Sequence, residues 1–173
     1  MIALNGSADW SGDIRSGSGT VTVGDGVLQG AYSYGARFGK SLGTNPEQLI
    51  AAAQAACYTM ALTAVLGAAG YVPESLHTSV RVQLRAAGIG PWLSRLDIET
   101  EGDVPGVEEA EFQRFAGEAE SRCSVSRALA GIPEIVLTAR LVVSALESQK
   151  DLHFRPARRE THEEGANQGE HLH

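Results

Sequence analysis

The sequence predicts an α+β fold in which antiparallel sheets surround one long, buried central helix. Three observations favour this class. Hydrophobic residues make up 43% of the 173 residues, which is enough for the core of a single domain. Alternating β-branched residues mark short strands, and 20 glycines allow many tight turns. Between the strands lies an apolar, alanine-rich stretch with helical spacing.

The first forty residues predict a meander of three strands. The expected strands cover residues 7–10, residues 18–23, where Thr alternates with Val, and a stretch that runs from residue 27 into residues 32–38. The Gly-Asp-Gly turn at residues 24–26 separates the second strand from the third.

A long helix is predicted next. Asn45 is a favourable N-cap, Pro46 suits the first helical position, and Glu47 suits the positive end of the helix dipole. Residues 49–69 carry almost no charge, so the helix is expected to be buried on all sides, at the centre of the domain or of a dimer. Its hydrophobicity comes mostly from alanine, which argues against a membrane span.

The second half of the domain predicts a hairpin, two helices and a last strand. Alternation over residues 77–87 and 93–100 indicates paired strands, with Leu96 and Ile98 facing inward. The remaining expected elements are an amphipathic helix over 107–121, a short helix from 124 to 130 and a strand over 135–143. We assign residues 1–146 to one domain and residues 147–173, which hold four of the five histidines, to a solvated polar tail.

The charge balance excludes some partners. There are 14 Lys and Arg residues against 21 Asp and Glu, a net charge of -7. A nucleic-acid binder or a protein of anionic membranes needs a basic face, so neither class is expected. No secretory signal is visible, and we expect a cytoplasmic protein.

The chain has two cysteines, Cys57 and Cys123, too few for a disulfide scaffold or a cysteine-based zinc site. Cys57 lies in the apolar helix, where burial makes a thiol inert unless a cation favours the thiolate. Cys123 lies between two helices, where a thiolate is more favourable and more accessible. The two cysteines fit an attacking and a resolving thiol; a structural disulfide and two inert core thiols are the alternatives.

Two stretches of the chain each include a cysteine in a distinctive setting: GTNPEQLIAAAQAAC at residues 43–57 and CSVS at residues 123–126. They resemble the first and second cysteine motifs of the OsmC/Ohr family, which comprises osmotically inducible protein C and the organic hydroperoxide resistance proteins. ADWSGD at 8–13 and YGARF at 34–38 are similar to the OsmC branch, and the latter matches the position of its active-site arginine. The resemblance covers about residues 6–146. Ser124 departs from it, since the family usually has proline there; serine adds a backbone N–H and removes no reacting atom.

The resemblance implies an OsmC-like fold, an intertwined homodimer and a thiol-dependent peroxidase of oxidative and osmotic stress defence. It implies that a Cys57 thiolate reduces organic hydroperoxides, and hydrogen peroxide more weakly, and then forms a disulfide with Cys123. Arg37 is the implied cation that lowers the pKa of Cys57 and holds the peroxide, and Glu47 is its implied partner. The implied reductant is a dithiol, carried by a lipoylated protein; no metal or other cofactor is required.

Helix geometry adds an expectation about the dimer. Glu47 and Cys57 are ten residues apart, which is about 15 Å along a helix. An Arg37 paired with Glu47 is therefore badly placed over the Cys57 of its own chain, whereas two antiparallel central helices would let each pair serve the partner's Cys57. The alternative to an enzyme is a non-catalytic binding module that holds an apolar ligand in the same groove.

Overall fold

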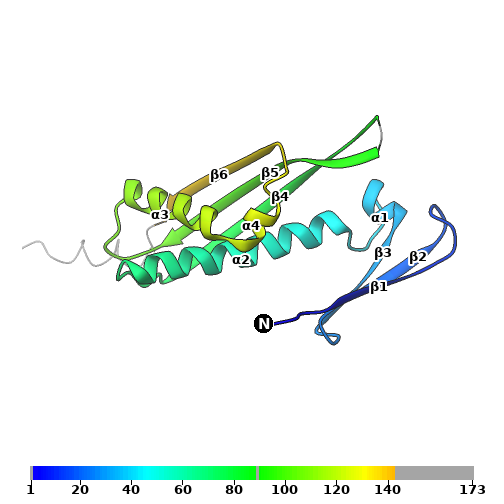
Figure 1. Ribbon diagram of the computed structural model, residues 1–173, viewed down its shortest axis with the longest axis horizontal. Helices are drawn as coiled ribbons and strands as arrows, with labels where there is room; N and C mark the ends of the chain where they lie inside the picture. The colour runs from blue at the N-terminus through cyan, green and yellow to red at the C-terminus, as the bar shows by residue number, and fades with distance from the viewer. Residues whose placement is uncertain (1, 89, 143–173) are drawn as a thin grey trace, which may run out of the picture. The chain divides into compact units, whose positions relative to one another are not determined.

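The structure is a computed structural model and describes residues 2–88 and 90–142 (Figure 1). The first three strands, β1 (Gly6–Ser11), β2 (Ser18–Val23) and β3 (Leu28–Ser33), form an antiparallel sheet in sequence order. This confirms the predicted meander, and β2 has the predicted limits. Every residue of these strands is exposed or half-buried, so this sheet has no core of its own within one chain. The predicted boundary at residue 146 and the tail lie outside the described residues.

The third strand was predicted too long. The chain leaves β3 after Ser33 and forms a short helix, α1 (Tyr34–Phe38). The Ser33 hydroxyl accepts a hydrogen bond from the Ala36 backbone N–H at 3.1 Å and so caps this helix. Arg37 therefore lies on a helical turn rather than on a strand.

The long helix α2 (Pro46–Ala68) starts where the capping residues predicted. The Asn45 side chain accepts from the Gln48 backbone N–H at 2.9 Å, and Pro46 occupies the first turn. By length and composition alone, α2 is apolar enough to cross a membrane, a property that core helices of soluble proteins share. In the structure it packs along β4 (Ser75–Ala87).

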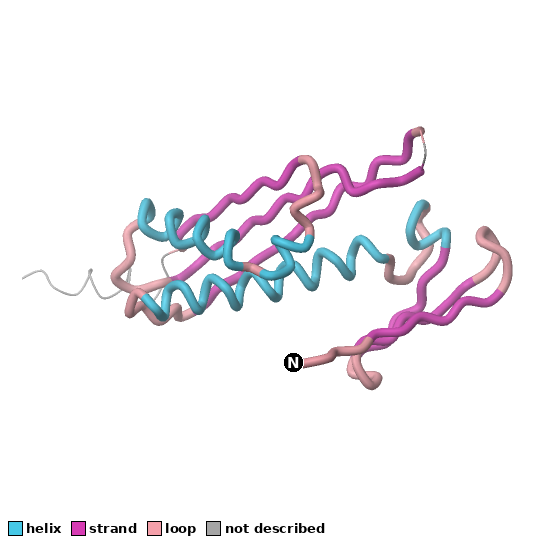
Figure 2. Tube along the Cα trace, viewed as in Figure 1, coloured by secondary structure: helices cyan, strands magenta, loops and turns pink. Residues whose placement is uncertain are grey.

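The second sheet has the order β4, β5 (Gly90–Asp103) and β6 (Glu134–Leu141). The hairpin of β4 and β5 is antiparallel, as predicted, but β6 pairs with β5 in parallel. A parallel neighbour needs a long crossover, which α3 (Glu109–Arg122) and α4 (Ser124–Ala128) supply. The helices α2, α3 and α4 cover one face of this sheet (Figure 2).

The core lies between α2, α3 and the second sheet. Its fully buried side chains come from all three: Tyr58, Leu62, Leu66, Leu96, Ile98 and Phe112. The prediction that α2 is buried on all sides is wrong for a single chain, because only one side of the helix meets this core. The exposed side carries mainly small or apolar residues: Ala52, Ala53, Ala56, Met60, Thr63, Ala64 and Gly67.

Candidate active site

The packing of α4 against α2 brings the two cysteines together. The Cys123 thiol donates a hydrogen bond to the Cys57 sulfur across an Sγ–Sγ distance of 3.1 Å, and both thiols are free. Cys57 is half-buried, whereas Cys123 is only 1% exposed. A disulfide requires an S–S distance of about 2.05 Å, so closing the pair takes a movement of about 1 Å.

Buried hydrogen bonds hold the Cys123 segment against α2. Gln54, one turn before Cys57, is fully buried and donates from Nε2 to the Ser126 hydroxyl at 2.6 Å. The Ser126 backbone N–H in turn donates to the Cys123 sulfur at 3.5 Å, so this cysteine caps α4. The Gln54 Oε1 atom has no hydrogen-bond partner among the described residues. These contacts fix the second sulfur beside the first.

Polar groups around Cys57 favour its thiolate. Burial raises the pKa of Cys57, but hydrogen bonds from the Ser124 hydroxyl and the Cys123 thiol oppose this effect. Backbone N–H groups of Val125 and Ser124 add to them, and the pKa of Cys57 falls below the ordinary thiol value. The Ser124 Oγ lies 3.4 Å from the Cys57 Sγ. Cys57 is also the more accessible sulfur of the pair, as an attacking thiol must be.

Arg37 and Glu47 form a second polar pair. The Arg37 Nη2 lies 2.7 Å from the Glu47 Oε1, and the Arg37 Nε also donates to this carboxylate, at 3.1 Å. Asn45 joins their two helices, because its amide donates to the Ala36 carbonyl at 3.2 Å while its oxygen caps α2. At Gly43, φ is 138° and an added Cβ would lie 3.0 Å from the Ala31 carbonyl oxygen, so glycine allows this close turn.

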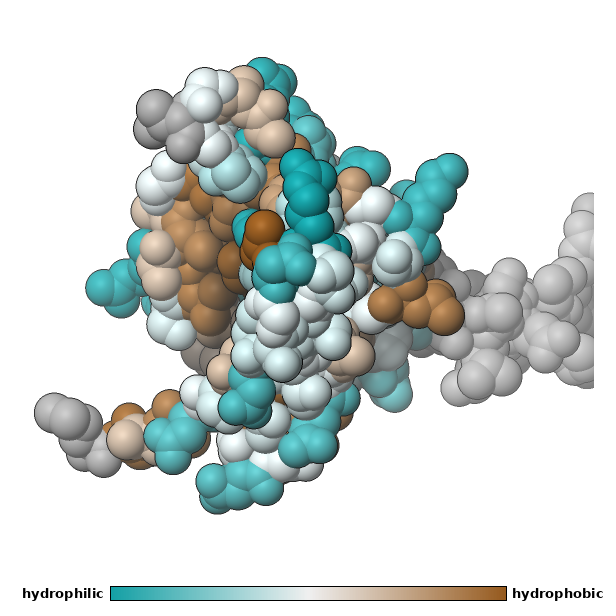
Figure 3. Space-filling model, turned by 90° about the vertical axis from the view of Figure 1, so that its right-hand side faces the viewer, coloured by the Kyte–Doolittle hydropathy of each residue, from teal (hydrophilic) through white to brown (hydrophobic). Residues whose placement is uncertain are grey.

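A cleft opens beside this pair, between the start of α2 and β4. Its volume is about 350 Å³, and its lining combines the guanidinium and carboxylate with apolar side chains, among them Ala51, Val80, Val82 and Leu84. Figure 3 shows apolar side chains gathered around a hollow on one face of the molecule. Such a lining suits a ligand that has one polar end and an alkyl body.

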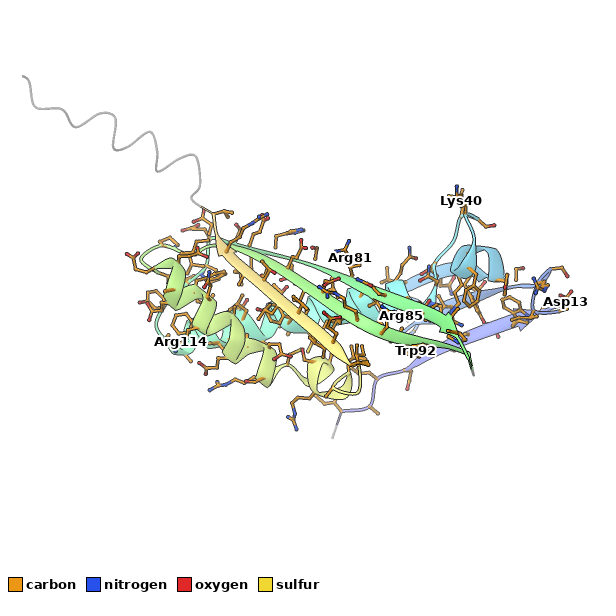
Figure 4. All side chains as sticks on the ribbon, turned by 90° about the horizontal axis from the view of Figure 1, so that it is seen from above. Asp13, Lys40, Arg81, Arg85, Trp92 and Arg114 are labelled. Atoms are coloured by element: carbon orange, nitrogen blue, oxygen red, sulfur yellow. The ribbon has the colours of Figure 1, made fainter. Side chains whose placement is uncertain are left out.

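The opposite face of the second sheet is polar. Arg81 and Arg85 of β4 and Trp92 of β5 lie on it (Figure 4). Burial raises the pKa of Asp97 on this face, but hydrogen bonds from Arg95 and Gln83 outweigh burial, and the pKa lies below the ordinary carboxyl value. Since α2 covers the other face, these charges are separated from the cysteines by the sheet.

Within one chain, the two polar pairs remain apart. Glu47 precedes Cys57 by ten residues on one continuous helix, or about 15 Å along its axis. Among the described residues, no hydrogen bond or ion pair links Arg37 to either cysteine. The expected guanidinium beside Cys57 is therefore not supplied by the same chain, and a polar side chain that does contact Cys57 is Ser124, at 3.4 Å.

Sequence reasoning missed the roles of Gln54, Ser124 and Ser126. One signal was available for Gln54, because a single buried amide one turn before a cysteine, in an otherwise apolar helix, requires a polar partner. The CSVS motif offered two hydroxyls, but which of them faces Cys57 depends on how α4 packs. The described residues hold no group of three or more His, Cys, Asp or Glu side chains that could bind a metal ion.

Comparison with known proteins agrees with this architecture. The model of the OsmC-like protein family matches residues 39–138. The peroxiredoxin OsmC of Escherichia coli K12 is 41% identical over 129 residues, which covers 74% of this chain and 90% of the relative. An organic hydroperoxide resistance protein of Xanthomonas axonopodis pv. citri is 37% identical over 101 residues, covering 56% of this chain and 66% of that protein.

The fold also matches solved structures. The crystal structure of an organic hydroperoxide resistance protein OsmC from Legionella pneumophila superimposes with a TM-score of 0.63 at 25% identity, and the match covers 80% of this chain and 97% of that one. The α+β architecture with two sheets and a long central helix is therefore the OsmC-like fold, as predicted. On its sequence and its fold, this chain belongs to the OsmC family.

Proposed function

We propose that the protein is a thiol-dependent peroxidase that reduces organic hydroperoxides to alcohols, and hydrogen peroxide more weakly, in cytoplasmic defence against oxidative and osmotic stress. One observation carries the proposal: Cys57, a thiol whose pKa is lowered, lies 3.1 Å from the only other cysteine of the chain. The relatives named a peroxiredoxin and an organic hydroperoxide resistance protein support the same class of reaction.

The first step is attack by the Cys57 thiolate on the outer oxygen of the hydroperoxide. The O–O bond breaks, a bond forms between sulfur and oxygen, and the alkoxide that leaves takes up a proton to become the alcohol. The thiolate loses two electrons to the peroxide and becomes a sulfenic acid.

The second step uses Cys123. Its thiol attacks the sulfenic sulfur, a disulfide forms between Cys57 and Cys123, and the oxygen leaves as water. The 3.1 Å contact supports this step, because the thiol is adjacent before oxidation begins. An external dithiol then reduces the disulfide by exchange and is itself oxidised to a disulfide. We propose a lipoylated protein as its source.

A homodimer would complete the site. The exposed side of α2, from Ala53 through Ala56 and Met60 to Gly67, is small or apolar and suits close packing against a second α2. Met60 is 75% exposed in the single chain. If the two helices pack antiparallel about a two-fold axis, the Arg37–Glu47 pair of one chain approaches the Cys57 of the other. The first sheet, which has no fully buried residue in its own chain, would gain a partner in the same assembly.

The cleft beside Arg37 supports an organic substrate. A guanidinium can hold the peroxide oxygens, while Val80, Val82 and Leu84 offer apolar surface to an alkyl chain. Hydrogen peroxide has no alkyl group to bury there, so its specificity constant is expected to be lower.

The test is steady-state reduction of cumene hydroperoxide and of hydrogen peroxide, each with dihydrolipoamide and with thioredoxin as electron donor. We expect faster turnover of cumene hydroperoxide and sustained turnover with dihydrolipoamide. A reduced protein that consumes no peroxide even in a single turnover, but binds apolar ligands, would support the binding module instead.

A further inference from the structure

We propose that the Ser124 hydroxyl is a working part of the site, donating a hydrogen bond to the Cys57 sulfur and so holding it as the thiolate. The inference rests on the proposed function only in treating Cys57 as the attacking thiol.

The contact is direct. Ser124 Oγ lies 3.4 Å from Cys57 Sγ, within hydrogen-bonding range for sulfur. A thiolate accepts hydrogen bonds and has no proton to donate, so in the ionised state the hydroxyl must be the donor. Among the groups that lower the pKa of Cys57, this hydroxyl has the largest effect.

The hydroxyl is held in place by the segment around it. Cys123 donates its backbone N–H to the Ala119 carbonyl at 2.9 Å, at the end of α3. Two residues beyond Ser124, the Ser126 hydroxyl is anchored by Gln54 at 2.6 Å. The serine backbone is thus fixed on both sides, which limits the entropy lost when its side chain meets the sulfur.

The backbone here does not require serine. Ser124 is the first residue of α4, a position that proline favours. Cys123, before it, has φ -65° and ψ 121°, a conformation that residues preceding proline readily adopt. Proline would therefore fit, and what serine adds is the hydroxyl and a backbone N–H.

Charged groups do not perform this role within one chain. At the end of α3, Glu118 forms an ion pair with Arg122 at 2.6 Å. The charge of Glu120 raises the pKa of Tyr58 and is not among the causes that shift the pKa of Cys57. On α4 the charged residue is Arg127, which is exposed.

The strand packed against α2 adds no charge on that side, since β4 presents Thr78 and Val80 toward the helix. The titratable group in contact with Cys57 is Cys123, at 3.1 Å. Arg37 lies on α1, and its partner Glu47 precedes Cys57 by ten residues, or about 15 Å along α2. Neutral donors are thus what stabilises the Cys57 thiolate in this chain.

Three substitutions separate the contribution of the Ser124 hydroxyl from that of the Ser124 backbone N–H. Ser124→Ala removes the hydroxyl and keeps the backbone N–H, Ser124→Thr keeps both, and Ser124→Pro removes both. Ser121→Ala is the matched control, because its hydroxyl donates to the Glu118 carbonyl at 2.7 Å and does not touch the sulfur.

The measurement is the pH dependence of Cys57 alkylation by iodoacetamide in the full chain, with the modified site identified by mass spectrometry. Ser124→Ala is expected to raise the pKa of Cys57 by about half a unit to one unit, and to slow alkylation about three- to tenfold at low pH. Alkylation well above the pKa should be unchanged. Ser124→Thr should restore the wild-type profile, Ser124→Pro should shift it at least as far as alanine, and Ser121→Ala should not move it.

A Ser124→Ala variant that melts like the wild type and keeps its alkylation profile would overturn the inference. So would a threonine variant that folds but behaves like alanine. Peroxide reduction is measured separately. If the profile shifts as expected and no variant or wild type reduces hydroperoxides, the proposed function fails and the role of Ser124 stands; the reverse pattern rejects Ser124 alone.

Discussion

The two polar pairs of the candidate site differ in how far a single chain buries them. The cysteine pair lies against the core: Cys123 is 1% exposed, and the Gln54–Ser126 hydrogen bond beside it is buried. The Arg37–Glu47 pair lies at an open cleft next to a sheet that buries none of its own residues, and the arginine side chain is 33% exposed.

Under the proposed mechanism, this difference divides the roles between two chains. A single chain would supply the groups for attack, thiolate stabilisation and disulfide formation, because all of them lie where α2 contacts α4. Arg37, the group proposed to bind the peroxide, lies on α1 and pairs with Glu47 in the first turn of α2, ten residues before Cys57. In the proposed dimer, the second copy would bring this pair to a sulfur. Substitutions in each of the two pairs test this division.

The largest effect is expected from the sulfurs. Cys57→Ser should reduce hydroperoxide turnover by about a thousandfold or more, because a serine hydroxyl is a poor nucleophile toward peroxide. Cys123→Ser should allow one turnover and then stall, since the sulfenic acid has no thiol partner. Peroxide consumption in a burst experiment measures both. Unchanged steady-state turnover in either variant would contradict the two-cysteine cycle.

The next effect concerns the arginine and tests whether sites are shared. Arg37→Ala should lower kcat/KM about a hundredfold through loss of a charge that stabilises the transition state. Refolding it together with the inactive Cys57→Ser chain should recover about a quarter of the wild-type activity, because half of the dimers are mixed and each holds one complete site.

No recovery on mixing would mean that Arg37 acts, if at all, within its own chain, and the shared site would be rejected. Arg114→Ala is the matched control for loss of an arginine. That residue is 59% exposed on α3 and pairs with Glu111 and Glu118, so the variant should keep full activity.

The rate of peroxide reduction should fall about tenfold for each pH unit on the acidic side of its pH profile. Because the pKa of Cys57 is lowered, its thiolate persists below the ordinary thiol range, and the rate should fall only as the pH drops through that lowered value. Stopped-flow reaction of reduced protein with cumene hydroperoxide measures it. A rate that still rises beyond the ordinary thiol pKa of about 8.5 would show that the sulfur is not activated.

The smallest effect is expected on stability. Gln54→Leu removes a buried hydrogen bond and leaves the Ser126 hydroxyl without its partner, which should lower the free energy of unfolding by about 1–3 kcal/mol. The double variant Gln54→Leu/Ser126→Ala removes both partners and should recover part of that loss. Urea unfolding of the wild type, the two single variants and the double variant, at fixed protein concentration, measures these free energies. If the losses of Gln54→Leu and Ser126→Ala simply add up in the double variant, the two side chains are not coupled by a hydrogen bond.

Local patterns in the sequence predicted the elements well where the interactions are local. Alternation predicted β2 with its observed limits, and Asn45 and Pro46 predicted the start of α2, because strand pairing surfaces and helix caps depend on neighbouring residues. The same reasoning extended β3 through Phe38, because the spacing did not reveal that Ser33 caps a helix.

The sequence alone therefore predicted the order of the elements except α1, and it supplied the two cysteines and the resemblance of the Arg37 and Glu47 segments to family motifs. Tertiary structure was needed for the 3.1 Å contact between sulfurs 66 residues apart, for the Ser124 hydroxyl beside Cys57 and for the exposure of half of α2. The physical reason is the distance along the chain over which each interaction acts. Helix caps and hydrophobic periodicity depend on residues one or two turns apart, whereas the electrostatic environment of a thiol depends on whichever distant segment packs against it.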